Sequence, residues 1–364
     1  MVRFFGPRRP GGDVDATFDL LTLSLLPGLQ PRTTAALRAR ASAAEILADP
    51  EAHADLLSEG ARRELRGGGA RRAAEAEALR ARRAGIAIVG RDEPAYPPLL
   101  REIADPPLIL YVRGSVAGHE DEPAVAIVGS RAASPNGAAL AWAMARELAA
   151  AGASVVSGFA RGIDSAAHRG ALEAGGRTLA VLGSGLECVY PAENAPLVAR
   201  VAERGAVVSE LPLTWGPRPG NFPRRNRIIA GLSHGVVVVE AQHKSGALIT
   251  ARLALEGGRE VMAVPGHPSL PGAAGTNALI RDGARLVRDA ADIALELGFE
   301  VGPVAAASQP ASGLLARLRV DKPVTLEELV DGSGRSLPEL LAELTELELA
   351  QQVRRLPGPL YVRR

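Results

Sequence analysis

The chain has 364 residues, more than a typical single domain, so its length predicts two or three domains. Hydrophobic residues make up 47% and charged residues 23%, a balance that excludes a largely disordered protein. Basic and acidic side chains nearly cancel, 42 Lys and Arg against 41 Asp and Glu, so nucleic-acid binding would have to come from local basic patches.

The cytoplasm is the compartment that the sequence predicts. The single cysteine, Cys188, excludes an internal disulfide and a cysteine-based zinc site, and it fits a reducing compartment. Residues 1–10 carry arginines with no apolar stretch after them, and the run Leu20–Leu29 is too short to span a bilayer. We therefore expect a cytoplasmic protein without membrane insertion.

Residues 1–83 are rich in Ala, Leu and Arg and predict an N-terminal helical domain. Within it, Leu25–Leu29 followed by a helical pattern over Thr33–Arg40 resembles a helix-hairpin-helix or SAM-like unit. Such a hairpin can hold a DNA phosphate with backbone N–H groups, and it can equally be a packing or protein-contact module. The sequence leaves both roles open.

Residues 84–300 alternate short apolar runs with Ala-rich helical patterns. The predicted strands are Ile86–Val89 (at an edge), Ala124–Val128, Ser154–Ser157, Thr178–Leu182, Ala206–Ser209, Gly235–Glu240 and Glu260–Val264. The predicted helices between them include Gly137–Ala151, Ser165–Ala174 and Ala195–Arg204. Apolar strands alternating with helices are typical of parallel strands covered on both faces. The pattern predicts an α/β domain, a Rossmann-like, doubly wound and mainly parallel sheet.

Residues 301–312 form a predicted linker of small residues and prolines, and residues 313–364 predict a winged-helix domain. Its expected helices are Gly313–Arg319, Thr325–Val330 and Ser336–Leu347, followed by a hairpin of Gln352–Arg355 and Leu360–Arg363. The helix in the recognition position carries the carboxylates Glu339, Glu343, Glu346 and Glu348 and no basic residue. Because carboxylates repel phosphates, we predict a protein-contact module, or at best a weak DNA contact through the wing arginines.

A candidate anion site follows the predicted strand Ala124–Val128. Gly129, Ser130 and Arg131 form a turn that leads into a predicted helix. Free N–H groups at a helix start, with an arginine beside them, can bind an anion. The dinucleotide fingerprint G-x-G-x-x-G is absent, because the next glycine is Gly137. The alternative is a tight turn with a solvated arginine.

A second candidate site is the basic stretch 221–229. Its candidate DNA-binding residues are Asn221, Phe222, Arg224, Arg225, Asn226 and Arg227, and Lys244 on a later loop joins them. Cations that track a backbone, beside an aromatic ring that stacks a base, are what single-stranded nucleic acid requires. The alternative is a solvated helix start whose Phe222 packs in the core.

The sequence offers no convincing catalytic machinery. Asp164 and His168 share one helix face, but Asp164 is well placed to cap a helix, and the six histidines lack metal-ligand spacing. We therefore expect no catalytic residues, metal or cofactor. The glycine-rich loop 272–277 is similar to that of nucleoside-monophosphate phosphoribohydrolases, so an enzyme of that class, using the same pocket, is the alternative function.

Several long segments occur in one order between about residues 90 and 290. They are Val128–Arg131, Ser157–His168, Leu182–Gly185 with Tyr190-Pro191, Ser209-Glu210, Asn221–Ser233, Ser245–Ala251, Val264–Gly266 and Gly275–Asn277. Together with the upstream stretch from Tyr96 to Tyr111, they resemble the DNA-processing protein A (DprA/Smf) family.

The resemblance implies a non-enzymatic protein of natural transformation. Members of that family bind and protect incoming single-stranded DNA, load a RecA-type recombinase onto it, and form homodimers through the Rossmann-like domain. The resemblance also implies that Gly129, Ser130 and Arg131 share a DNA-binding pocket with Phe222, Arg224, Asn226 and Arg227. Lys244 is a weaker candidate for the same pocket.

Overall fold

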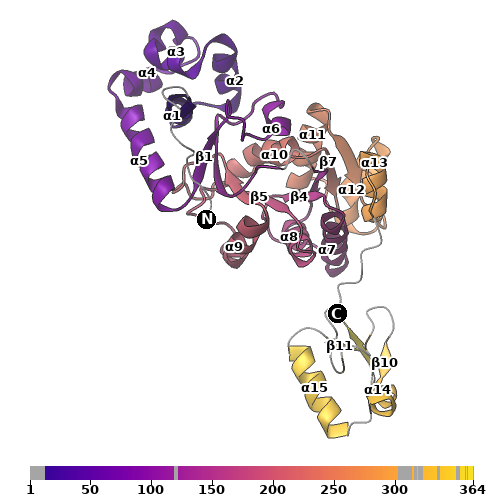
Figure 1. The fold of residues 1–364 in the computed structure, drawn as a ribbon. Helices are drawn as coiled ribbons and strands as arrows, with labels where there is room; N and C mark the ends of the chain where they lie inside the picture. The colour runs from indigo at the N-terminus through magenta and orange to yellow at the C-terminus, as the bar shows by residue number, and fades with distance from the viewer. Residues whose placement is uncertain are drawn as a thin grey trace. The chain divides into compact units, whose positions relative to one another are not determined.

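The computed structural model describes residues 13–118, 122–301, 323–333, 337–349, 353–356 and 360–363, together with residues 314, 318 and 358. Contacts divide the chain into two compact units, Met1–Gly302 and Pro303–Arg364 (Figure 1). The predicted boundary between residues 83 and 84 falls inside the first unit and stays a prediction. The predicted linker lies outside the described residues from position 302 onward.

A mainly parallel sheet forms the centre of the first unit. Its strands are β1 (Ala87–Gly90), β2 (Ile109–Gly114), β3 (Ala124–Val128), β4 (Ser154–Ser157), β5 (Thr178–Val181), β6 (Ala206–Ser209), β7 (Gly235–Val238), β8 (Glu260–Ala263) and β9 (Arg285–Leu286). They lie in the order β1-β2-β6-β5-β4-β3-β7-β8-β9. The pairs β1–β2 and β2–β6 are antiparallel, and the other neighbours are parallel. The predicted α/β fold is confirmed.

Helices cover both faces of the sheet. They are α6 (Pro98–Arg101), α7 (Pro135–Ala150), α8 (Ile163–Glu173), α9 (Ala195–Arg204), α10 (Asn221–Gly231), α11 (Gly246–Glu256), α12 (Ala274–Arg281) and α13 (Ala290–Leu297), with single 3₁₀ turns at Ala192–Asn194 and Pro271–Ala273. Val125 and Ile127 of β3 pack in a cluster with α7, α8 and α13. Ala126 and Val128 pack in a cluster with α10 and α11. Alternate residues of one strand are therefore buried on opposite faces, as its apolar sequence predicts.

The N-terminal helical region packs against the β2 side of the sheet. It consists of α1 (Asp13–Ser24), α2 (Pro31–Arg40), α3 (Ala43–Ala48), a 3₁₀ turn (Pro50–His53), α4 (Glu59–Arg66) and α5 (Gly69–Arg83). Leu20, Leu37 and Ile46 share one buried cluster with Ile109 of β2. In addition, the carboxylate of Glu77 on α5 accepts the backbone N–H of Leu213 at 2.6 Å. This bond attaches the helical region to the segment that follows β6.

The second unit has the winged-helix arrangement that its sequence predicts. It contains β10 (Val324–Thr325), α14 (Leu326–Ser333), α15 (Leu337–Leu349), β11 (Val353–Leu356) and β12 (Leu360–Arg363). The strands form an antiparallel sheet in the order β10-β12-β11. The predicted helix Gly313–Arg319 lies almost entirely outside the described residues, as does the side chain of Glu346. Within the described part of the chain, no helix has the length and apolarity needed to cross a membrane.

Candidate nucleic-acid interface

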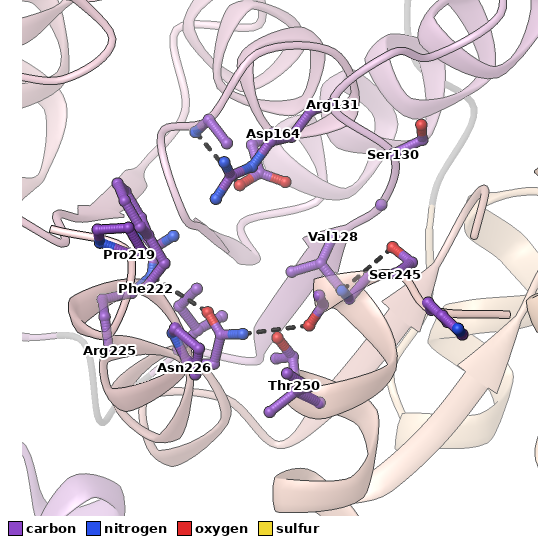
Figure 2. Close-up of a pocket in the computed structure, with 18 of the residues that line it drawn as sticks. Val128, Ser130, Arg131, Asp164, Pro219, Phe222, Arg225, Asn226, Ser245 and Thr250 are labelled. Atoms are coloured by element: carbon purple, nitrogen blue, oxygen red, sulfur yellow. Dashed lines mark hydrogen bonds between the residues drawn. The ribbon is translucent and has the colours of Figure 1, made fainter. Parts of the chain in front are cut away.

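A pocket of about 710 Å³ opens where the strand order reverses. β3 lies between β4 and β7, so the turns that follow β3 and β7 flank a crevice at the carboxyl ends of the strands. Figure 2 shows side chains from the β3 turn, α10 and the start of α11 around this pocket. Of the predicted site residues, those that line it are Gly129, Ser130, Arg131, Phe222, Arg225, Asn226 and Lys244.

The turn after β3 is held tightly and presents Arg131. A Cβ on Gly129 would lie 2.6 Å from the side chain of Ile163, so only glycine fits there. The carbonyl of Ser130 accepts the N–H of Ile163 at 3.2 Å, and its hydroxyl accepts the N–H of Ala132 at 3.2 Å. Arg131 itself is exposed. Its guanidinium lies 4.8 Å from the centre of the Phe222 ring, within cation–π range.

The helix start beside this turn is already occupied by a carboxylate. Glu240, just after β7, accepts the backbone N–H of Ser134 at 2.9 Å and also the Ser134 hydroxyl. Ser134 in turn caps α7 by accepting the N–H of Gly137 at 3.0 Å. A Cβ on Gly137 would lie 2.4 Å from the Glu240 carboxylate. The N–H groups of Ser134 and Gly137 at this helix start are therefore not free for an anion, contrary to the expectation, and Arg131 is an exposed donor of this turn.

Phe222 forms part of the pocket wall rather than of the core. The ring is half-buried in the first turn of α10. It makes a tilted aromatic contact with Tyr190, whose ring centre is 5.6 Å away. Behind it, a Cβ on Gly183 would lie 2.8 Å from the ring. Phe222 thus contacts both Tyr190 and Arg131, and it keeps surface toward the pocket.

The three arginines of α10, Arg224, Arg225 and Arg227, make different contacts. Arg225 is buried and donates to the carbonyls of Gly158 and Val181. Its burial lowers the pKa of the guanidinium to about 10. Arg224 and Arg227 point elsewhere, to the carboxylate of Glu210. We find that neither of these two lines the pocket.

The Glu210 pairs are close and largely buried. Arg224 Nε lies 2.9 Å from Glu210 Oε1, and Arg227 Nη2 lies 2.6 Å from Oε2. Arg227 Nε also lies 3.3 Å from the carboxylate of Asp105. The Arg227 and Glu210 side chains are 8% and 7% exposed. Both arginines therefore connect α10 to the segment after β6.

The remaining predicted residues differ in their access. Asn226 is buried and its Nδ2 donates to the carbonyl of Gly246 at 3.2 Å, which links α10 to the start of α11. Lys244 is exposed on the loop before α11 and lines the pocket, whereas Asn221 does not. Sequence reasoning did not select Arg218, Gln242 and Thr250, which also line it. Arg218 lies in a proline-rich stretch next to the basic run, and that proximity was the available signal.

Asp164 and His168 are buried and contact other parts of the protein, which fits a structural role. The N-cap of α8 is Gly162, so Asp164 sits inside the first turn, and its carboxylate accepts the N–H of Ala160 at 3.3 Å instead of capping the helix. Burial raises the pKa of Asp164. Burial lowers the pKa of His168 to about 3, and its Nδ1 is 2.7 Å from the Thr178 hydroxyl. Among the described residues, no group of His, Cys, Asp or Glu side chains could hold a metal ion.

Comparison with known proteins places these features in a family. A family model described as DNA recombination-mediator protein A matches residues 87–298. Protein Smf from Escherichia coli is 42% identical over 291 residues, which cover 76% of this chain and 77% of that protein. The chain belongs to the DNA recombination-mediator protein A family. A second model, the DprA winged helix domain, matches residues 300–359.

Solved structures of the recombination-mediator family agree with this assignment. DNA processing protein A from Streptococcus pneumoniae superimposes with a TM-score of 0.61 at 32% identity, over 79% of this chain and 99% of that one. DNA processing protein A from Helicobacter pylori gives a TM-score of 0.51 at 31% identity, over 56% of this chain and 94% of that one. The latter structure is described as showing a single-stranded DNA binding mode.

Proposed function

We propose that this chain binds single-stranded DNA in the pocket between the β3 turn and α10, and that it loads a RecA-type recombinase onto that DNA during natural transformation. The observation that carries the proposal is the Arg131–Phe222 pair at a pocket that Lys244 also lines. A cation beside an aromatic face offers one group to a phosphate and another to a base. The single-stranded DNA mode described for the Helicobacter pylori relative supports the same ligand.

The pocket suits a flexible strand better than a duplex. Exposed cations, Arg131, Arg218 and Lys244, stand around a cavity at one edge of the sheet. The rings of Phe222 and Tyr190 can stack only on a base whose face is free, and the bases of a duplex are already stacked on one another. We therefore propose Arg131, Phe222 and Lys244 as direct DNA contacts. Arg224, Arg225 and Arg227 hold α10 in place.

Partners and compartment follow from the family rather than from the pocket. We propose that the chain acts in the cytoplasm as a homodimer through the Rossmann-like domain. Exposed apolar side chains on the β9 and α13 side of the sheet, Leu286 at 48% and Leu295 at 78%, support such an interface. A mass measurement in solution checks it, and a monomeric mass at micromolar concentrations would contradict it.

A nucleotide-hydrolysing enzyme is the less favoured function. Among the described residues that line the pocket, Asp164 is the single carboxylate. It is engaged by the N–H of Ala160 and by the charge of Arg225, so it is poorly placed to activate water. We therefore propose a non-enzymatic role. Release of free base from nucleoside monophosphates, abolished by a pocket substitution, would reverse this ranking.

A recombinase-loading assay tests the proposal. Single-stranded DNA is coated with a single-strand-binding protein, RecA-type recombinase is added, and its DNA-dependent ATP hydrolysis is followed with and without this chain. We expect the chain to shorten the lag before hydrolysis and Arg131→Ala to restore the lag. Binding of DNA with no change in the lag would remove the loading half of the proposal and leave the binding half.

A further inference from the structure

Trp215 is exposed beside the proposed DNA pocket. The chain contains two tryptophans, and aromatic residues make up 3% of it. Even so, Trp215 leaves 47% of its surface accessible, in the loop that joins β6 to α10. A large aromatic side chain is usually buried because its apolar surface is costly to hydrate. Trp215 therefore offers accessible aromatic surface that a ligand could cover.

The loop that carries Trp215 is fixed by its backbone. The carbonyl of Trp215 accepts the N–H of Gly185 at 2.8 Å, and its N–H donates to the carbonyl of Pro212 at 2.9 Å. The N–H of Leu213 is held by Glu77 at 2.6 Å. A Cβ on Gly185 would lie 2.1 Å from the Pro212 carbonyl, so the contact is close. A loop whose backbone is already ordered loses less conformational entropy when a ligand binds to it.

Arg218 joins this loop to the pocket. Its guanidinium lies 5.7 Å from the centre of the Trp215 ring, and the same residue lines the pocket together with Phe222. Trp215 is therefore one side chain away from the cavity. The stretch 214–220, Thr-Trp-Gly-Pro-Arg-Pro-Gly, contains no carboxylate, so its only charged side chain is the cation Arg218.

We infer that Trp215 and Arg218 form an outer binding subsite for single-stranded DNA, in which Trp215 stacks one base of the strand as it leaves the pocket. The inference rests on the proposed function and extends it. The occupant is a nucleic-acid base, because the subsite repeats the arrangement of the pocket, a guanidinium over an aromatic ring, as in Arg131 and Phe222. Base stacking on an aromatic ring needs no particular sequence.

Tryptophan fluorescence gives a direct test. Trp142 lies on α7, which covers the opposite face of the sheet from α10, so Trp142→Phe leaves Trp215 as the single reporter. The Trp142→Phe variant is titrated with labelled oligothymidylates of about four and about 16 nucleotides. The anisotropy of the label and the emission of Trp215 are measured together. We expect the longer strand to quench Trp215 emission. We also expect Trp215→Ala to weaken binding of the longer strand about tenfold, and to leave the shorter strand unchanged.

Matched variants distinguish a failure of the outer subsite from a failure of the pocket. Trp215→Phe keeps a ring and should retain most of the affinity for the longer strand, whereas Arg131→Ala should weaken both lengths. Unchanged emission on binding of the longer strand, with Trp215→Ala binding as wild type, would overturn the outer subsite and leave the pocket intact. If the wild-type chain gives no anisotropy change with either strand, the proposed function itself fails.

Discussion

The guanidinium of Arg131 lies 4.8 Å from the centre of the Phe222 ring. Arg131 belongs to the turn after β3, and Phe222 belongs to the first turn of α10, so the contact exists only because the sheet brings these segments to one edge. The pair joins a cation and a stacking surface in advance of any ligand. We therefore expect both side chains to contribute to DNA binding.

Arg131→Ala should weaken single-stranded DNA binding and reduce its salt dependence. If the side chain contacts one phosphate, the slope of log affinity against log salt should flatten by about 0.7. Arg204→Ala is the matched control because it removes the same charge from an exposed position. Arg204 ends α9 and precedes the amino end of β6, whereas the pocket lies at the carboxyl ends of the strands. Equal slopes for wild type, Arg131→Ala and Arg204→Ala would contradict a direct phosphate contact.

Arg227→Ala should lower the free energy of unfolding and leave the affinity for single-stranded DNA nearly unchanged. The substitution leaves the buried Glu210 carboxylate with one partner fewer, and breaking such a pair costs about 3 kcal/mol. Arg224→Ala is the comparison, because Arg224 is 32% exposed and its loss should cost about 1 kcal/mol. Urea unfolding measures both. A DNA affinity that falls as far in folded Arg227→Ala as in Arg131→Ala would show that Arg227 meets the DNA.

The sequence predicts the positions of these arginines better than their roles. Helical spacing puts Arg224 and Arg227 on one face of α10 and Arg225 on another, which could be read from the sequence. The residues that pack against that face could not be read from the sequence. Glu210 arrives from β6 and Gly158 from β4, and both contacts depend on the strand order. The sequence alone therefore predicts one basic surface over residues 221–229.

The same limit explains the differences in the fold. The parallel strands were predictable because each is apolar and alternates with a helix. β2 was missed because it pairs antiparallel with β1 and β6 and stands outside that alternation. β9 was not predicted because its two residues are too few to form a recognisable strand pattern. Glu240 shows the effect at the site, since no local pattern places its carboxylate at the start of α7.

Buried His168 should make the protein less stable in acid. Its pKa is about 3 in the folded chain and near 6.5 when unfolded, so between these values the unfolded chain binds more protons. This contribution to the free energy of unfolding is complete above pH 6.5 and is lost as the pH falls. Between pH 6.5 and pH 5, the free energy of unfolding of His168→Asn should fall by about 2 kcal/mol less than that of the wild-type chain. Asp164 titrates in both proteins, so their difference reports His168. Identical losses would contradict a neutral, buried imidazole.

Removal of residues 303–364 should leave most single-stranded DNA affinity intact. The described part of α15 presents Glu339 and Glu348 as exposed residues, and carboxylates do not favour a phosphate backbone. Anisotropy with the truncated chain measures the effect, with circular dichroism as the control for folding. A folded truncation that binds as poorly as Arg131→Ala would mean that the winged helix carries the DNA.

The most direct test of the central claim compares single-stranded and duplex DNA in one titration. Labelled oligothymidylate and a duplex of the same length are each titrated with the wild-type chain and with Arg131→Ala, Phe222→Ala and Arg204→Ala. We predict that wild type and Arg204→Ala prefer the single strand, and that the two pocket variants lose that preference. Equal wild-type affinity for single-stranded and duplex DNA would contradict a pocket built from a cation and a stacking ring.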